Sequence, residues 1–319
     1  MVTEAHPPPS GIAATDPLVY IVVLNWNGRD DTLACLRSLE PVWSERTKGV
    51  VVDNGSTDGT PDAIRAAFAA VEVLETGRNL GFTGGNNVGL RFALDLGADY
   101  VLLLNNDTVV DPLFVREMLK VAARSEAIGF VSPKIYFLDP PDLLWFAGAR
   151  FSTRTGYGRV IGYGEPDRGQ YDDVRTIDRP CGCAVLVSRR LCREAGLMED
   201  KLFLYVDEVE WMLRGRKHGF KACYAPKAKV WHKVSASVGR ESHPDAFYYG
   251  VRNTLYALNT HARCGTGILR YFRELSVTSV HLAALLLSSA PKWDGLRAIR
   301  QGLRDYRRGT FGRRVLRSR

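Results

Sequence analysis

Short apolar runs alternate with longer segments of helical periodicity through the first third of the chain. Four runs have the composition of buried strands, namely Val19–Leu24, Gly49–Val52, Val71–Leu74 and Tyr100–Leu104. The segments between them place apolar residues at helical spacing, as at Leu33, Leu36 and Leu39. Because strands joined through helices pair in parallel, the pattern predicts an α/β fold with a mostly parallel sheet and helices on both faces.

A segment rich in polar residues and glycine follows each of the four expected strands. The segments are Asn25–Gly28, Asp53–Thr60, Arg78–Asn87 and Asn105–Asp107. The carboxyl ends of parallel strands lie at one edge of a sheet, and open α/β sheets bind their ligands there. The sequence therefore predicts a binding site that several loops build at a single rim.

The segment Asn105–Asp107 offers hard oxygen ligands at this rim. A single carboxylate flanked by amide oxygens suits Mg²⁺ or Mn²⁺ that also holds phosphate oxygens. The alternative is a polar turn leading into a helix that Asp111 and Pro112 start. Asp53 also has two possible roles. Its carboxylate can bind a base or a ribose hydroxyl, or it can merely shape an Asx turn.

The glycines between Gly81 and Gly89 do not form a dinucleotide fingerprint. They follow the third strand instead of the first, and their spacing is not G-x-G-x-x-G. This disfavours a dehydrogenase. Glycine still lets a ligand approach the main chain closely, so a nucleotide or a sugar is compatible with this loop.

The second half of the chain is less regular. The region 134–179 predicts irregular strands and a long loop over the site, and Cys181–Val187 returns to a strand. A helix is expected from Asp207 through Arg216. Two short strands, Lys221–Tyr224 and Ala228–Trp231, then lead to His232, and a mainly helical pattern begins at Ala246.

Two groups of titratable side chains stand out in this half. Asp207, Glu208 and Glu210 place three carboxylates at a helix start, where the helix dipole alone would favour them. Alternatively, repulsion and partial burial would raise the pKa of one carboxylate and make it a general base. His232 is either a structural residue or a neutral ligand beside a metal or a diphosphate.

Five segments occur in a characteristic order: DNGSTDG, RNLGFTGGNN, LLLNNDTVVDP, FLYVDEVEWMLRGRKHGF and VWHKVSAS. Over residues 19–253 the chain resembles the inverting glycosyltransferases of family 2, which have the GT-A fold with a Rossmann-like sheet. It is most similar to bacterial rhamnosyltransferases that use dTDP-rhamnose. The resemblance implies metal-dependent transfer, with Mg²⁺ or Mn²⁺, of a sugar from a nucleoside diphosphate to a hydroxyl of a cell-surface or lipid-linked glycan.

The resemblance also implies roles for particular residues. Asp107 matches the last acid of the D-x-D metal motif, and His232 matches a histidine that reaches the metal or the diphosphate. Glu208 would be the catalytic base, with Asp207 beside it. The expected nucleotide site consists of Asn25, Asn27, Asp53, Asn54, Asn79, Gly84, Gly85, Asn86 and Asn106, where Asp53 would hold the base.

The chain departs from the family pattern at two places. Asn105 replaces the first acid of D-x-D, which removes a negative charge and should weaken metal affinity. Asp207 and Glu208 reverse the usual Glu-Asp order, so we favour Glu208 as the base by position alone. The chain also contains the YY-x-x-RN segment of the family at residues 248–253, whose role the sequence does not assign.

Three alternatives stay open. The donor could be a UDP- or GDP-hexose, or the protein could bind a nucleotide sugar without catalysing transfer. A basic tail could also meet nucleic acid, although no aromatic-basic interleaving of a known RNA-binding pattern occurs. The intact acid cluster disfavours a non-catalytic protein.

Composition and charge indicate the cellular compartment. The chain has 319 residues, a net charge of +8 and six cysteines without a C-x-x-C pair, which is typical of a cytoplasmic protein with reduced thiols. Residues 1–16 predict a disordered lead without a signal pattern. Residues 17–131 and 132–245 would be the donor and acceptor halves of a catalytic domain, followed by a helical extension at 246–319.

The positive charge is concentrated in the last 24 residues, LRAIRQGLRDYRRGTFGRRVLRSR. The preceding apolar segment, Leu275–Ala290, is too short to span a bilayer. An apolar helical face beside arginines can lie on the inner face of the cell membrane, or the helix can simply be solvated.

Overall fold

The computed structural model describes residues 16–233, 243–262 and 267–315, so the lead expected at 1–16 lies outside the described residues except for its last one. The first half is the parallel sheet that the sequence predicts. Its strands are β1 (Val19–Asn25), β2 (Thr47–Asp53), β3 (Glu72–Glu75) and β4 (Tyr100–Asn105), in the order β4-β1-β2-β3. All three strand pairs are parallel.

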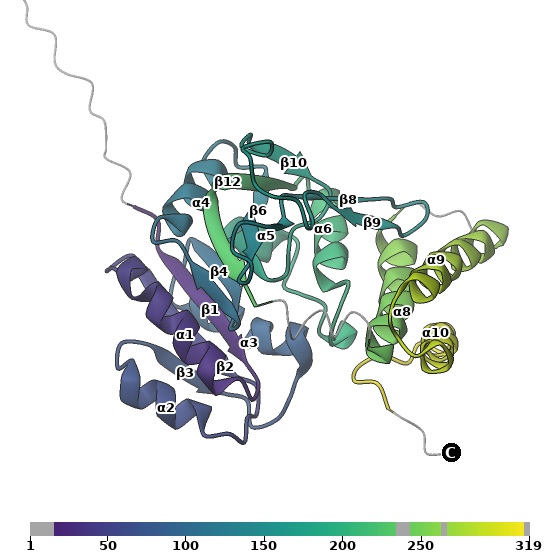
Figure 1. Ribbon diagram of the computed structural model, residues 1–319, viewed down its shortest axis with the longest axis horizontal. Helices are drawn as coiled ribbons and strands as arrows, with labels where there is room; N and C mark the ends of the chain where they lie inside the picture. Colours follow the sequence, from purple (N-terminus) through teal and green to yellow (C-terminus); the bar gives the residue numbers. More distant parts are fainter. Residues whose placement is uncertain (1–15, 234–242, 263–266, 316–319) are drawn as a thin grey trace, which may run out of the picture.

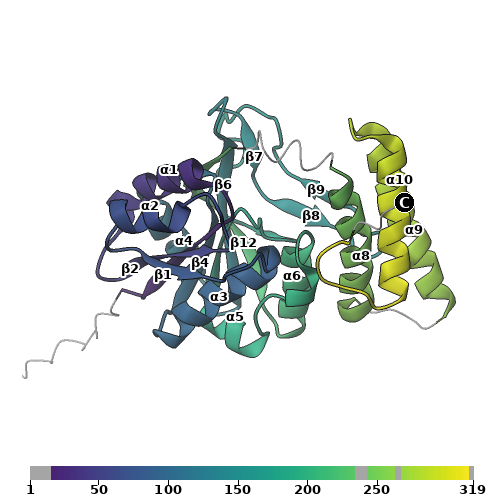
Figure 2. The same ribbon diagram turned by 90° about the horizontal axis from the view of Figure 1, so that it is seen from below.

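Helices cover both faces of this sheet, as expected. The connections are α1 (Arg29–Leu39) with the 3-10 turn η1 (Glu40–Val42), α2 (Thr60–Ala67) and α3 (Gly81–Asp95). Figure 2 shows α1 and α2 on one side of β1 and β2, and α3 on the other. The strands are apolar on both faces because both are covered, which accounts for runs such as Val50–Val52 that are completely buried.

The second half extends the same sheet with mixed directions (Figure 1). Its strands are β5 (Thr108–Val110), β6 (Ile128–Phe137), β7 (Leu144–Phe146), β10 (Arg175–Ile177), β11 (Ala184–Ser188) and β12 (Lys221–His232). β11 lies antiparallel between β4 and β6, and β12 pairs in parallel with β6. The helices here are α4 (Phe114–Ala122), α5 (Arg189–Glu194) and α6 (Asp207–Lys217), with the 3-10 turn η2 (Asp200–Leu202) before α6.

Two expectations for this half need correction. The two short strands expected before His232 form one strand, β12, whose register against β6 shifts between Ala225 and Lys229. Pro226 lies in that shift, where the missing N–H of proline is tolerated. The region 134–179 is also more regular than expected, because it holds the end of β6, β7, β10 and a separate hairpin of β8 (Ala149–Phe151) and β9 (Gly158–Val160).

Three helices stand beside the sheet domain: α8 (Pro244–His261), α9 (Ile268–Leu287) and α10 (Lys292–Arg307). They share a second hydrophobic core, in which Val209 and Leu213 of α6 pack with residues of α8 and α10. Figure 2 shows α6 between the sheet and α8. Within the described part of the chain, no helix combines the length and apolar character that crossing a bilayer requires.

Strand register brings the polar strand ends together, as the sequence predicts. Asn25 at the end of β1 is paired with Asp53 at the end of β2, and Leu24 is paired with Asn105 at the end of β4. The antiparallel pairing of β5 with β12 sets His232 opposite Thr108. The loop after β4 therefore meets the end of β12 at this rim of the sheet.

Candidate active site

Asp107 and His232 are in contact although 125 residues separate them. Asp107 lies in the turn between β4 and β5, and its Oδ1 is 3.0 Å from Nε2 of His232. The imidazole is buried against the indole of Trp145, with ring centroids 4.8 Å apart and edge-to-face geometry. The contact follows from the β5–β12 register, which the sequence alone did not reveal.

These two side chains are also the candidate ligands for a divalent metal. Among residues 16–233, 243–262 and 267–315, no group of three or more His, Cys, Asp or Glu side chains is arranged to hold a metal. The buried Nδ1 of His232 has no hydrogen-bond partner in the same residues. One carboxylate and one imidazole fit a cation that takes its other ligands from substrate phosphates and water, as Mg²⁺ does.

Asn25 is the centre of a hydrogen-bond network at the rim. Its Nδ2 donates to Oδ1 of Asp53 at 2.8 Å and to Oγ of Ser56 at 3.0 Å. Its Oδ1 accepts from Oγ1 of Thr32 at 2.8 Å and from Nδ2 of Asn106 at 3.2 Å. The side chains of Asn25 and Asp53 are buried, so they tie β1, β2 and the loop after β4 into one rigid edge.

Three further asparagines of the expected nucleotide site shape the loops around this edge. Oδ1 of Asn27, an exposed residue with φ of 51°, accepts from the backbone N–H of Thr57 at 2.8 Å. Oδ1 of Asn54 accepts from the N–H of Leu80 at 2.9 Å, and its Nδ2 donates to the carbonyl of Gly81 at 3.0 Å. Oδ1 of Asn79 accepts from the N–H of Gly81 at 2.8 Å.

Glycines of α3 allow close packing against β1 and against Leu80, the residue that precedes the helix. A Cβ on Gly85 would lie 2.5 Å from Cδ1 of Leu24, and one on Gly84 would lie 2.9 Å from Cβ of Leu80. Asn86 is buried and donates through Nδ2 to the carbonyl of Phe82 at 2.9 Å. These residues bring the first turns of α3 close to the rim, whatever ligand binds there.

The three acids of α6 separate into different environments. Glu208 is partly exposed, and its Oε1 lies 2.5 Å from Nη1 of Arg179. Asp207 is buried, and its Oδ2 has no hydrogen-bond partner among the described residues. Burial raises the pKa of Asp207 well above its usual range, and the charge of Glu208 adds to that rise. Asp207 and Glu208 therefore differ sharply in solvation although they are neighbours.

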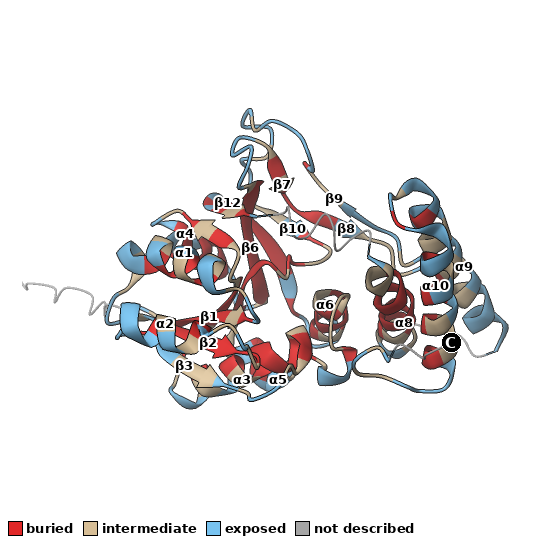
Figure 3. Cartoon of the chain, turned by 60° about the horizontal axis from the view of Figure 1, so that its bottom comes forward, coloured by how far each residue is buried: buried red, intermediate tan, exposed pale blue. Residues whose placement is uncertain are grey.

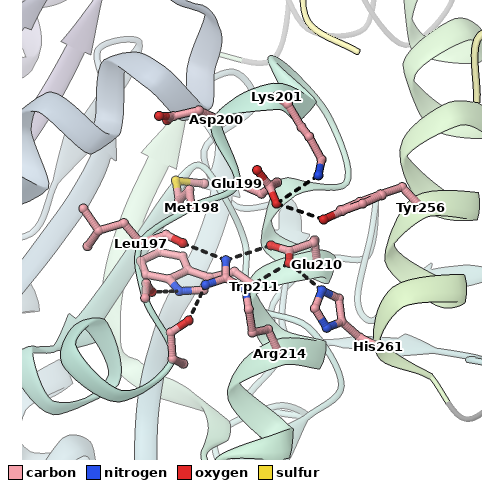
Figure 4. A network of polar contacts seen from close by, with 12 residues as sticks. Leu197, Met198, Glu199, Asp200, Lys201, Glu210, Trp211, Arg214, Tyr256 and His261 are labelled. Carbon is pink, nitrogen blue, oxygen red and sulfur yellow. Dashed lines mark hydrogen bonds and ion pairs between the residues drawn. The ribbon is translucent and has the colours of Figure 1, made fainter. Parts of the chain in front are cut away.

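Glu210 has a structural role. Figure 4 shows its carboxylate between Arg214 and His261. Arg214 donates through Nε and Nη2, both at 2.9 Å, and Nε2 of His261 lies 2.7 Å from Oε1. Burial opposes ionisation of Glu210, but the bonds from His261 and Arg214 outweigh it and lower the pKa. This carboxylate joins α6 to α8 and does not face the rim.

The segment from Arg179 to Cys183 connects the two parts of the site. Arg179 holds Glu208, while the carbonyl of Cys183 accepts from the N–H of Asn105 at 2.8 Å. Burial raises the pKa of the Cys183 thiol, and Cys181 and the charge of Asp107 add to that rise. Sequence reasoning missed Arg179 and Trp145, since neither lies in a recognisable motif.

Comparison with known proteins agrees with this arrangement. Residues 20–192 match the family model described as glycosyl transferase family 2. The N-acetylglucosaminyl-diphospho-decaprenol L-rhamnosyltransferase of Mycobacterium tuberculosis is 28% identical over 225 residues, which cover 65% of this chain and 73% of the relative. The dTDP-rhamnosyl transferase RfbF of Shigella flexneri is 23% identical over 281 residues, covering 86% and 90%.

The fold comparison gives the same result. The structure of a mannosyltransferase from Pyrobaculum calidifontis, in complex with GDP-Man and Mn²⁺, superposes with a TM-score of 0.56 at 16% identity. The match covers 92% of this chain and 83% of that one. It confirms the GT-A fold expected from the sequence. Because the family model spans more than half of the chain, this protein belongs to glycosyl transferase family 2.

Proposed function

We propose that this glycosyltransferase moves rhamnose from dTDP-rhamnose to a hydroxyl of a cell-surface or lipid-linked glycan, with inversion at the anomeric carbon. Two relatives named as rhamnosyltransferases, from organisms as distant as Mycobacterium tuberculosis and Shigella flexneri, support the choice of sugar. The runner-up is the same reaction with a UDP- or GDP-hexose donor. The GDP-Man complex of the mannosyltransferase that shares this fold favours that alternative.

The observation that carries the proposal is the meeting of Asp107 and His232 at the strand-end rim. The rim has Asn25 and Asp53 on one side, which suits a nucleoside. The fixed Asp107–His232 pair at the end of β4 suits a diphosphate and its cation. A protein that only bound a nucleotide sugar would need the rim residues Asn25, Asp53, Asp107 and His232. It would not need the acids of α6.

The proposed reaction requires one base. Glu208 takes the proton of an acceptor hydroxyl, whose oxygen forms a bond to the anomeric carbon. The bond from that carbon to the diphosphate oxygen breaks, and the nucleoside diphosphate leaves with the electron pair. Residues 17–131 would bind the donor and residues 132–245 the acceptor. Arg179 fixes the position of the Glu208 carboxylate through their ion pair.

Asp107 and His232 would hold the Mg²⁺ or Mn²⁺ ion. When bound, the cation offsets the negative charge that develops on the departing diphosphate. Asn105 in place of an acid leaves the site with a single carboxylate, so the diphosphate itself has to supply several of the ligands.

A donor panel tests the proposed function. Purified protein is incubated with dTDP-rhamnose, UDP-hexoses and GDP-hexoses, with and without Mn²⁺, and with a lipid-linked glycan acceptor. Thermal shift measures binding, because a ligand that binds only the folded state raises the unfolding temperature. Transfer of rhamnose with inverted anomeric configuration supports the proposal. Binding of every donor without transfer or hydrolysis would leave only a nucleotide-sugar-binding protein.

We also propose that α9 and α10 rest on an anionic membrane at the inner face of the cell membrane, with the catalytic domain in the cytoplasm. Apolar side chains are exposed along α9 and at the start of α10, including Ile268 (70%), Leu286 (73%), Leu287 (90%) and Trp293 (77%). Figure 3 shows this exposed surface at the edge of the molecule. Arg300, Arg304 and Arg307 of α10 line one hollow together with Leu303. Apolar side chains beside arginines suit an anionic lipid interface.

A further inference from the structure

The chain that leads into the acids of α6 has an unusual backbone. Phe203, Tyr205 and Val206 have φ values of 68°, 64° and 65°, and none of them is glycine. L-residues rarely adopt this region, and bulky or β-branched ones least of all. Val206 is the N-cap of α6, so the strained segment ends directly at Asp207. Such a segment keeps its conformation only if its surroundings impose it.

Asn253 of α8 supplies a large part of that constraint. Its Nδ2 donates to the carbonyls of Leu202, Leu204 and Tyr205 at 3.1, 2.9 and 2.9 Å. The residue is completely buried. One amide group therefore gathers three carbonyl oxygens of the strained segment, which no apolar side chain of the same volume could do.

Arg252 holds the same segment from the adjacent position on α8. Its Nη2 donates to the carbonyl of Leu202 at 2.9 Å, and its Nη1 donates to the carbonyl of Gly312 at 2.8 Å. Its Nε donates to Oδ1 of Asn253 at 2.9 Å, which fixes the orientation of that amide. The guanidinium is completely buried among aromatic rings, with Tyr248 and Tyr249 each 5.0 Å from Cζ.

The opposite side of the segment is fixed by α3. The carbonyl of Phe203 accepts from the N–H of Phe82 at 2.7 Å. A Cβ on Gly81 would lie 2.5 Å from that same carbonyl oxygen, so only glycine permits the approach. The segment thus lies between the start of α3, in the expected donor half, and α8, in the C-terminal helices.

We propose that Arg252 and Asn253 are positioning residues for the reaction: they hold the segment 202–206, and with it the start of α6, so that Glu208 faces the acceptor in a fixed geometry. This assigns a role to the YY-x-x-RN segment and rests on the proposed function. A small displacement of a base lowers the rate of the chemical step strongly, because the reacting atoms must be aligned. The Asn25–Asp53 contact of the expected donor site joins β1 to β2, outside this segment, so we expect donor binding to depend on the segment less.

The test compares two asparagines of the same helix. Asn253→Ala removes the bonds to the segment, whereas Asn259→Ala removes bonds within the C-terminal helices, to Tyr306 at 2.7 Å and from Arg273 at 3.2 Å. We expect kcat of the Asn253→Ala enzyme to fall about tenfold or more, with the KM for the donor changed less than about threefold. Asn259→Ala should keep kcat within about twofold of the wild type.

Amide hydrogen exchange gives a readout that does not depend on turnover. At a temperature well below both unfolding midpoints, exchange should accelerate at residues 202–206 in Asn253→Ala and stay unchanged there in Asn259→Ala. If Asn253→Ala does not fold, Arg252→Lys replaces it, because lysine keeps the charge but cannot reach Leu202 and Gly312 together. Equal losses of kcat in the two asparagine variants would overturn the proposal, as would full activity of Asn253→Ala. A wild-type protein that transfers no sugar would instead refute the proposed function, while the exchange comparison would still apply.

Discussion

Nη1 of Arg179 lies 2.5 Å from Oε1 of Glu208, and this ion pair separates two neighbouring acids that the sequence presents as equivalent. Glu208 is partly exposed and held by Arg179, so its carboxylate is accessible to a substrate. Asp207 is buried, and one of its oxygens has no hydrogen-bond partner among the described residues. Accessibility therefore favours Glu208 as the base, whereas the raised pKa that the sequence reasoning expected of a base belongs to Asp207.

The first prediction concerns this base. Glu208→Gln keeps the size of the side chain and removes its capacity to accept a proton. We expect kcat to fall by roughly 10²-fold or more, with donor binding little changed. Steady-state kinetics with the preferred donor measures both. If Asp207→Asn produces this loss and Glu208→Gln does not, the assignment of the base is wrong.

The second prediction concerns the effect of Asp207 on stability. Burial, followed by the charge of Glu208, raises the pKa of Asp207 in the folded state, so folding favours its neutral form. That contribution is fully present below the unfolded pKa and is lost as pH rises through the folded pKa. Asp207→Asn should therefore unfold at a higher denaturant concentration than the wild type near pH 8, with little difference near pH 4. A stabilisation that does not vary with pH would contradict this explanation.

The third prediction concerns Glu210, whose pKa is shifted in the opposite direction. Burial disfavours its charge, but the bonds from His261 and Arg214 prevail and lower the pKa. Its stabilisation is present above the unfolded pKa and is lost as pH falls through the folded pKa. Glu210→Gln should cost about 3 kcal/mol at pH 7, the usual result of removing one partner of a buried ion pair.

Urea titrations at several pH values measure this cost, which should shrink as the solution becomes acidic. Glu194→Gln is the matched control, because Glu194 forms an i,i+4 pair with Arg190 on an exposed surface. Surface pairs contribute about 0.5 kcal/mol or less, so this control should be nearly neutral. Equal effects of the two substitutions would show that Glu210 is not held as the structure indicates.

The fourth prediction concerns the metal. Asp107→Ala removes the only carboxylate of the 105–107 segment and should lower Mn²⁺-dependent turnover by about 10²-fold or more, with the fold intact. Titration of Mn²⁺ in the presence of the nucleoside diphosphate should show weaker binding. Asp111→Ala changes an acid four residues away that accepts from the N–H of Leu113, so it should leave metal binding unchanged. Near wild-type activity of Asp107→Ala would exclude it as a ligand.

The fifth prediction concerns the membrane surface. The wild type should float with anionic vesicles at low salt and bind neutral vesicles weakly. The double variant Leu287→Ser and Trp293→Ser should bind the anionic vesicles at least about tenfold less well, because each side chain loses on the order of 1.5 kcal/mol of apolar burial. Leu96→Ser is the control, since Leu96 is an exposed leucine at the end of α3. A wild type that stays unbound at low salt would refute the membrane proposal.

The sequence by itself determined the strands, the polar rim and the order of motifs. The sequence reveals strands and helices because the preference of a residue for either one depends mainly on its near neighbours in the chain. Parallel pairing then places their polar ends at one edge, as at Asn25 and Asp53. The fold was predictable from these local patterns, apart from the single long β12 and the short strands between residues 134 and 179.

Only the tertiary structure decided which side chains meet. Asp107 contacts His232 because of the register of β5 against β12. Glu208 contacts Arg179, which lies in the loop after β10 and is 29 residues away in the sequence. Local patterns carry no information about such partners. The same holds for Glu210, which looked like a third member of the acid cluster but faces Arg214 and His261. One helical turn directs neighbouring side chains to different sides, so burial and partner depend on what packs against each face.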